Sequence, residues 1–305
     1  MQTTQTSTQG TDQVLEKTIP GAGPAAPKPQ PDTDLFLIAC RALFWPAIAL
    51  ALFLTTVPVY LLFKVSISKP AELLTQHPTF WISQPTFKHW ANVLGSPELW
   101  EPLSKSLMVA TLTTVISVAI AAPAAYVIAR FPRKVRYTTI LSLLFTRMFP
   151  DVLIALPVAI VFMKMGLMDT VPGLVFAHLI GNLPFLAWIL VGTFETIPKA
   201  LEEAATVDGC SRFQALMQVV FPAATPGIMV GAMFVWLNSW NEFTYAMYLS
   251  TANKTLPLQT FFYQAKGSWF DSAAYATILT IPVILITFAL QKYLVSGSLS
   301  GAVKG

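Results

Sequence analysis

Six stretches of about 20 mostly apolar residues divide the chain, and they constrain its fold more than any other feature. Each is long enough to cross the hydrocarbon core of a bilayer as a helix. Backbone polar groups in lipid must be hydrogen-bonded internally, so an all-α polytopic membrane protein with six transmembrane helices is expected. The stretches cover residues 42–63, 106–129, 138–163, 173–194, 227–249 and 275–294.

The composition agrees with a surface that faces lipid. Of 305 residues, 54% are hydrophobic and 11% are charged, whereas about a quarter are charged in soluble domains. A net charge of only +4 gives no reason to expect a nucleic-acid partner. Residues 1–34 are rich in Thr, Gln and Pro, which predicts a disordered tail ahead of one membrane domain over 35–305.

Basic residues set the expected orientation. Arg130, Arg133, Lys134 and Arg136 cluster between the second and third apolar stretches. Loops rich in Lys and Arg stay in the cytoplasm. With six spans, both termini and the loop 195–226 are then predicted to be cytoplasmic, and the first two spans enclose a long external segment, 68–104.

The loop 195–226 is too polar to span a membrane, and its pattern predicts a helix, a turn and a second helix. Pro198 is suited to a helix start. Gly209 supplies the left-handed conformation that ends helices. Ser211 and Gln214 have the spacing of a capping box for the second helix.

The second helix of this loop is predicted to be amphipathic and to end at Pro222. Phe213, Leu216, Met217 and Val220 fall at positions i, i+3, i+4 and i+7, which makes one apolar stripe. Such a helix lies on a membrane surface or docks in a groove of a partner. Few basic residues flank the stripe, and this favours a partner.

The same loop resembles a known family motif. Glu203-Ala204-Ala205, three residues, Gly209, nine residues, Val219, one residue and Phe221-Pro222 is similar to the EAA loop, E-A-A-x3-G-x9-I-x-L-P, of ABC-importer permeases. The spacing is intact, and Val for Ile and Phe for Leu are the two departures.

The resemblance implies that the first helix of the loop sits in a cleft of an ATP-hydrolysing subunit, with Glu203 as the anionic contact. The chain itself has no G-x-x-x-x-G-K-[ST] sequence, so ATP and magnesium are expected on that partner and no cofactor is expected here. The residues assigned to ATPase coupling are Glu203, Ala204, Ala205, Asp208, Gly209, Phe213 and Pro222.

Enzymatic and metal sites are not predicted. Neither H-E-x-x-H nor G-x-S-x-G occurs, so no catalytic residue is assigned. His77 and His89 lie twelve apart without neighbouring ligands, which fits no metal site.

Two further stretches narrow the resemblance to the carbohydrate branch of this family. Trp240-Asn241-Glu242-Phe243-x-Tyr245-Ala246 and the C-terminal residues 297–305 resemble the smaller permease of maltose-type sugar importers. That likeness implies a bacterial inner-membrane location, a second homologous permease, two ATPase copies and an extracytoplasmic solute-binding protein. It also implies that the C-terminal tail contacts the ATPases.

Polar residues inside apolar stretches are costly and are candidate functional groups. Asn238, Asn241 and Glu242 share one face of the predicted fifth span, beside Trp240 and Tyr245. They form a candidate substrate pathway, and packing against the second permease is the alternative.

Two more pairs are spaced i, i+4. Arg147 and Asp151 predict either a structural ion pair or a gating group in the pathway. His178 and Asn182 predict hydrogen bonds between helices.

Two other functions stay open at this stage. The importer could carry glycerol phosphates, amino acids or peptides, although the fifth-stretch and C-terminal matches favour a sugar. A stand-alone secondary transporter would need a cluster of paired ionisable groups for coupling ions, and it would leave the Glu203 loop unexplained.

Overall fold

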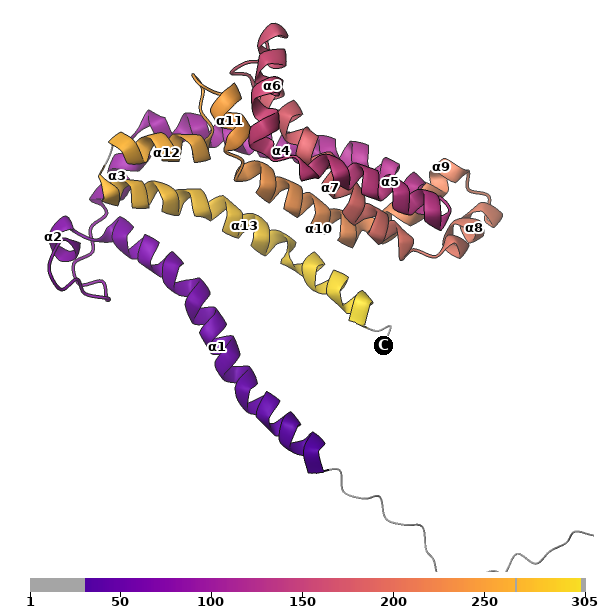
Figure 1. Ribbon diagram of the computed structural model, residues 1–305, viewed down its shortest axis with the longest axis horizontal. Coiled ribbons are helices and arrows are strands. Elements are labelled where there is room, and N and C mark those ends of the chain that lie inside the picture. Colours follow the sequence, from indigo (N-terminus) through magenta and orange to yellow (C-terminus); the bar gives the residue numbers. More distant parts are fainter. Residues whose placement is uncertain (1–30, 267, 303–305) are drawn as a thin grey trace, which may run out of the picture. The chain divides into compact units, whose positions relative to one another are not determined.

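The computed structural model describes residues 31–266 and 268–302, which are mostly helical, with the segment 74–87 outside helices (Figure 1). Extended pairing in this part of the chain is limited to one bridge between Ser68 and Pro85. The helices are α1 Pro31–Ile67, α2 Pro70–Leu73, α3 Lys88–Leu94, α4 Pro97–Arg130, α5 Arg133–Phe145, η1 Thr146–Met148, α6 Asp151–Lys164, α7 Val171–Glu195, α8 Lys199–Val207, α9 Arg212–Ala215, η2 Leu216–Val220, α10 Phe221–Trp240, α11 Thr244–Leu249, α12 Leu256–Lys266 and α13 Trp269–Ala302.

The predicted all-α membrane fold is confirmed. Within residues 31–266 and 268–302, five helices are long and apolar enough to cross a membrane, or six when one bent pair of helices is counted as a span. The predicted tail lies largely outside the described residues, since α1 begins at Pro31. At the other end α13 runs to Ala302, and residues 303–305 are likewise outside the described part.

Contacts divide the chain into two units, residues 1–56 and 57–305. Within the second unit α4, α7 and α10 pack against one another, and α13 packs against α10 (Figure 1).

The third span is not the single helix predicted over 138–163. It is bent by 83° between 133–148 and 151–164. Pro150 disfavours helical geometry at the residue before it, and Phe149 is accordingly extended, with ψ of 124°. Because Pro150 also has extended ψ, at 134°, the chain turns sharply before α6 begins.

The fifth span also differs from the prediction at both of its ends. Pro222 does not end the preceding helix, because α9, η2 and α10 form one continuous helical stretch, 212–240. The π-helical turn η2 shifts the backbone register just before Pro222, so the proline enters where its missing N–H is tolerated. At the other end α10 stops at Trp240, and α11 starts afresh at Thr244.

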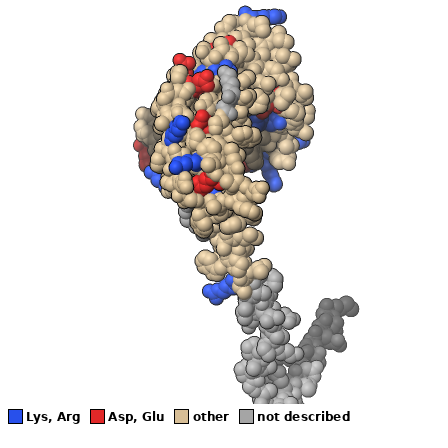
Figure 2. Space-filling model, turned by 90° about the vertical axis from the view of Figure 1, so that its left-hand side faces the viewer, with Lys and Arg blue, Asp and Glu red and all other residues tan. Residues whose placement is uncertain are grey.

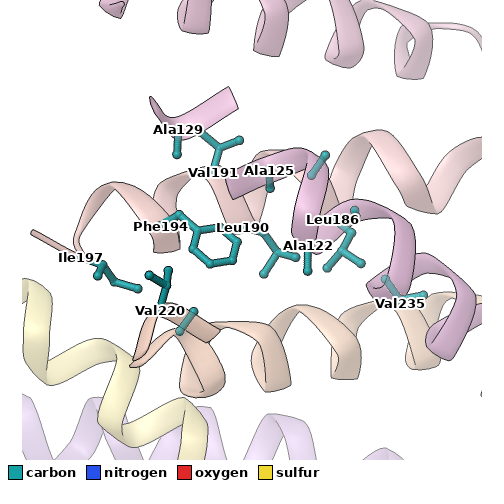
Figure 3. Packing of buried hydrophobic residues seen from close by; sticks show 13 residues of the cluster. Ala122, Ala125, Ala129, Leu186, Leu190, Val191, Phe194, Ile197, Val220 and Val235 are labelled. Carbon is teal, nitrogen blue, oxygen red and sulfur yellow. The ribbon is translucent and has the colours of Figure 1, made fainter. Parts of the chain in front are cut away.

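Small side chains let α4 approach α7 closely. Ala122, Ala125 and Ala129 lie along one side of α4 and meet Leu190 and Phe194 of α7 in a buried cluster (Figure 3). Positions three and four apart share a helix face, so the alanines make a smooth contact strip. This strip fixes the distance between the two helices that carry the features described below.

Large apolar side chains cover the outer surface of the helices, and Figure 2 shows wide areas without a charged residue. On α5 and α6 these exposed residues include Leu141, Phe145, Leu153, Leu156 and Val161. A surface of this kind is stable against lipid tails or another apolar protein surface.

One carboxylate organises the segment between α1 and α3. Glu72 accepts hydrogen bonds from the backbone N–H of Ser83 at 3.1 Å and of Gln84 at 3.3 Å. It also accepts from the hydroxyls of Ser83 and Thr79. Bonds to the charged form stabilise it, and the Ser83 N–H in particular lowers the pKa of Glu72 below its ordinary value.

This segment should loosen in acid. A lowered folded-state pKa gives stability that is fully present above the unfolded value, about 4.3, and is lost as the pH falls through the lower folded value. We expect the Ser83 and Gln84 amides to lose protection from hydrogen exchange, relative to intrinsic rates, over that window.

Glu72→Gln should remove the pH dependence, whereas Glu101→Gln, at an exposed glutamate of α4, should keep it. Protection of both amides that stays unchanged through the window would contradict the role of Glu72.

Candidate functional site

The loop between α7 and α10 contains a short helix, α8, which ends in a glycine turn. Gly209 has φ of +92°. The N–H of Gly209 bonds to the carbonyl of Thr206 at 3.1 Å, and that of Cys210 to the carbonyl of Ala205 at 2.9 Å. These bonds form a Schellman motif, in which a left-handed residue closes the helix end. The turn is therefore held by backbone bonds that only glycine meets without strain.

The second helix of the loop begins with the predicted capping box, which is confirmed. Ser211 N–H donates to Gln214 Oε1 at 2.8 Å, and Gln214 N–H donates to Ser211 Oγ at 3.3 Å. Both ends of the turn are thus satisfied locally, and the orientation of α8 against α9 follows from the loop's own sequence.

The residues assigned to ATPase coupling differ in exposure. Ala205 is buried, where α8 packs on the following helix. Glu203, Ala204, Asp208, Gly209, Phe213 and Pro222 are exposed. Phe213 is 68% exposed and Val207 86%. Glu203 therefore projects beside exposed apolar side chains.

The neighbouring glutamate has a different environment, which the sequence did not reveal. Glu202 Oε1 accepts from the Arg130 guanidinium at the end of α4, and its Oε2 accepts from the Tyr126 hydroxyl at 2.8 Å. Arg130 also donates to the carbonyl of Phe194 at 3.1 Å. The only advance signal was the i, i+4 spacing of a tyrosine and an arginine before the basic turn.

A second group of polar residues gathers in the middle of the bundle. The breaks before α6 and before α11 both face α7, and they enclose a cavity of about 250 Å³. Four predicted pathway residues line it, while Trp240 does not. The lining polar residues are Arg147, Asp151, His178, Asn182, Asn238, Asn241, Glu242, Thr244 and Tyr245.

Hydrogen bonds link α7 and α10 beside this cavity. His178 Nδ1 lies 2.6 Å from Ser239 Oγ, and Asn238 Nδ2 donates to Asn182 Oδ1 at 2.9 Å. Asn182 in turn donates to the carbonyl of His178 at 2.8 Å. The predicted interhelical role of His178 and Asn182 is confirmed.

Glu242 is not on a face of the fifth span, as the periodicity had suggested, because the helix has already ended. Its carboxylate accepts from the N–H of Tyr245 at 2.6 Å and of Ala246 at 3.1 Å. It thereby caps the start of α11, where backbone N–H groups lack helical partners. His178 Nε2 lies 3.2 Å from the same carboxylate, which joins this cap to α7.

Arg147 and Asp151 do not form the predicted ion pair, since none joins them among the described residues. The bend at Pro150 separates what would have been neighbours on one helix face. Both side chains line the cavity instead. The Arg147 guanidinium lies against Gly181, where an added Cβ would be 2.4 Å from Nη1.

A second cavity, of about 300 Å³, shares Arg147, Asn238 and Asn241 with the first. Two aromatic rings that sequence reasoning had not assigned to the pathway, those of Phe185 and Phe234, complete its wall. The rings meet edge to face, with centroids 6.3 Å apart. Amide groups and aromatic faces thus share one wall.

Trp240 has a core position. It is fully buried and stacks on Trp236, with centroids 5.1 Å apart and an interplanar angle of 9°. Tyr245 is also buried, at 3% exposure. The chain offers no grouping of three His, Cys, Asp or Glu side chains that could hold a metal ion within the described ranges.

Comparison with known proteins assigns this architecture to a family of transport proteins. The family model described as "Binding-protein-dependent transport system inner membrane component" matches residues 107–298. The diacetylchitobiose uptake system permease protein DasC of Streptomyces coelicolor is 30% identical, over 87% of this chain and 99% of DasC. The trehalose/maltose transport system permease protein MalG of Thermococcus litoralis is 32% identical, over 72% of this chain and 82% of its own length.

A solved structure has the same fold. It is a crystal structure of a bacterial ABC transporter involved in the import of the acidic polysaccharide alginate, with a TM-score of 0.67 and 23% identity over 88% of this chain and 99% of the matched chain. The matched relatives are transport components and not catalytic enzymes. With its apolar helices and its match over most of the membrane domain, this chain belongs to the family of inner-membrane components of binding-protein-dependent transport systems, as a multi-pass ABC permease subunit.

Proposed function

We propose that this permease carries a sugar or a related polyol or oligosaccharide, and that ATP hydrolysis on a partner subunit is coupled to transport through α8. The observation that carries the coupling is the exposed Glu203 on a helix whose end is locked by the Gly209 turn. An ATPase pair that holds ATP and magnesium, a second permease and an extracytoplasmic solute-binding protein complete the proposed importer.

The surface of α8 and α9 has the chemistry of a docking element. Leu201, Val207 and Phe213 are 44%, 86% and 68% exposed, and the carboxylates of Glu203 and Asp208 are exposed on the same loop. Apolar side chains grouped around a charge favour a groove of another protein that carries a basic residue. Ala205, buried beneath, keeps α8 close to its own helix.

The contact between α8 and the basic turn supports the cytoplasmic assignment. Arg130 ends α4 immediately before the basic residues at 133, 134 and 136, and it binds Glu202 of α8. The α8 surface and the basic turn therefore lie at the same end of the bundle. If the positive-inside rule holds for that turn, α8 faces the compartment that contains ATP.

The sugar assignment rests on the wall of the second cavity. Sugars combine hydroxyl groups, which bond to amides, with C–H faces, which pack on aromatic rings. Asn238 and Asn241 lie in that wall with Phe185 and Phe234. Relatives named for diacetylchitobiose and trehalose/maltose transport support the same substrate class.

Glu203→Lys should prevent assembly with the ATPase while membrane insertion is retained, because it replaces the outward-facing carboxylate of α8 with a positive charge. Co-purification of the ATPase with detergent-solubilised permease measures this. Glu203→Gln, which keeps the shape and removes the charge, should weaken binding less. Full recovery of the ATPase with Glu203→Lys would refute the docking role.

Gly209→Pro should abolish ATP-driven uptake, because proline fixes φ near −65° and Gly209 has φ of +92°. Gly209→Asn is the matched control, since asparagine tolerates the left-handed region better than other residues. Uptake of radiolabelled disaccharide into proteoliposomes should fall to background with proline and remain substantial with asparagine. Equal uptake by both variants would show that the turn geometry is unimportant.

Gly181→Ala should reduce uptake with little loss of thermal stability. The new methyl group must displace the end of the flexible Arg147 side chain from the cavity wall. Gly192→Ala is the matched control on the same helix, because a Cβ added there has no neighbouring atom within 4 Å. It should leave uptake unchanged, and it should favour folding slightly because alanine lowers the conformational entropy of the unfolded chain. Normal uptake by Gly181→Ala would show that the position of Arg147 does not affect transport.

A further inference from the structure

Arg130 binds two different elements at once. Its guanidinium donates to Glu202 of α8 and, at 3.1 Å, to the carbonyl of Phe194 near the end of α7. The guanidinium carbon also lies 5.3 Å from the centre of the Tyr126 ring, a cation–π distance. One side chain at the end of α4 thus contacts α7 and α8 together.

Both carboxylate oxygens of Glu202 contact side chains of α4. Oε1 pairs with the Arg130 guanidinium, and Oε2 accepts a hydrogen bond from the Tyr126 hydroxyl at 2.8 Å. The side chains of Arg130 and Glu202 are only 17% and 20% exposed, so solvent screens this pair less than a surface ion pair. Glu203, the next residue, is exposed, so α8 presents one carboxylate inward and one outward.

A second ion pair holds the ends of the same helices. Arg136 of α5 pairs with Glu195, the last residue of α7, and donates to the carbonyl of Ala129 in α4 at 3.3 Å. This ion pair and the alanine strip already hold α7 against α4. The Arg130–Glu202 contact is different, because it joins α8 itself to α4.

Without that contact α8 would be attached by few other elements. Residues 196–198 join it to α7, and it packs on α9 and η2. Both of those elements continue into α10. A movement of α8 would therefore be transmitted to α10, but not directly to α4.

We propose that Arg130, with Tyr126, is a positioning residue that ties α8 to α4, so that movement of the docked ATPase drives α4 and α7 together with α10. This inference rests on the proposed coupling role of α8. Arg130 and Glu202 do not bind the ATPase in this scheme. They decide which helices move when α8 moves.

The test uses the complete importer in proteoliposomes, with radiolabelled disaccharide uptake and ATP hydrolysis measured in the same sample. Glu202→Gln and Arg130→Gln should assemble with the ATPase in normal amounts. The number of sugar molecules transported per ATP should fall about tenfold, the size of a typical coupling between sites. The double variant should fall no further than either single variant, because both remove one shared contact.

Tyr126→Phe is a milder variant that removes one hydrogen bond and keeps the ring, and it should give a smaller loss in the same ratio. Arg133→Gln, at an exposed arginine of the same basic turn, should leave the ratio unchanged.

An unchanged transport ratio in assembled Glu202→Gln would overturn the inference while leaving ATPase docking intact. Loss of ATPase binding by Glu202→Gln would overturn it as well, since Glu202 would then belong to the docking surface. Failure of the unaltered chain to bind any ATPase would instead refute the proposed function itself.

Discussion

The need to satisfy every backbone polar group away from water governs this structure. Continuous helices do this by themselves, so the interruptions are the informative places. The break before α11 leaves N–H groups without helical partners, and Glu242 accepts from two of them. That cap is joined to α7 through His178, and the two cavities lie around the same junction. The requirement that shapes the fold thus also produces its polar centre.

Much of the architecture could be predicted, because long apolar stretches have one stable arrangement in lipid. The breaks were harder. Pro150 carries a local signal for the bend in the third span, which span length alone concealed. The break after Trp240 has no glycine or proline nearby, and it depends on a carboxylate supported from another helix. Periodicity therefore placed Asn241 and Glu242 on a helix that had already ended.

In the candidate site, too, features set by neighbouring residues could be predicted and features set by distant residues could not. Ser211, Gln214 and Gly209 act on their own neighbours, so the capping box and the glycine turn could be predicted from the sequence. Glu202 and Glu203 are chemically identical neighbours, and only Arg130 and Tyr126, some seventy residues earlier, distinguish them. Arg147 likewise acquires its place from Gly181 of α7, a contact that no spacing in the sequence encodes.

The uninterrupted helical stretch 212–240 has a mechanical consequence. Its 29 residues span about 43 Å at a rise of about 1.5 Å per residue. It begins at the exposed surface of α9 and ends beside Asn241, which lines both cavities. A rod of that length acts as a lever, and a tilt of about 5° displaces its far end by about 4 Å. The π-helical turn near its base is the point at which such a lever would bend, so stiffness there sets how much of the stroke reaches the cavity.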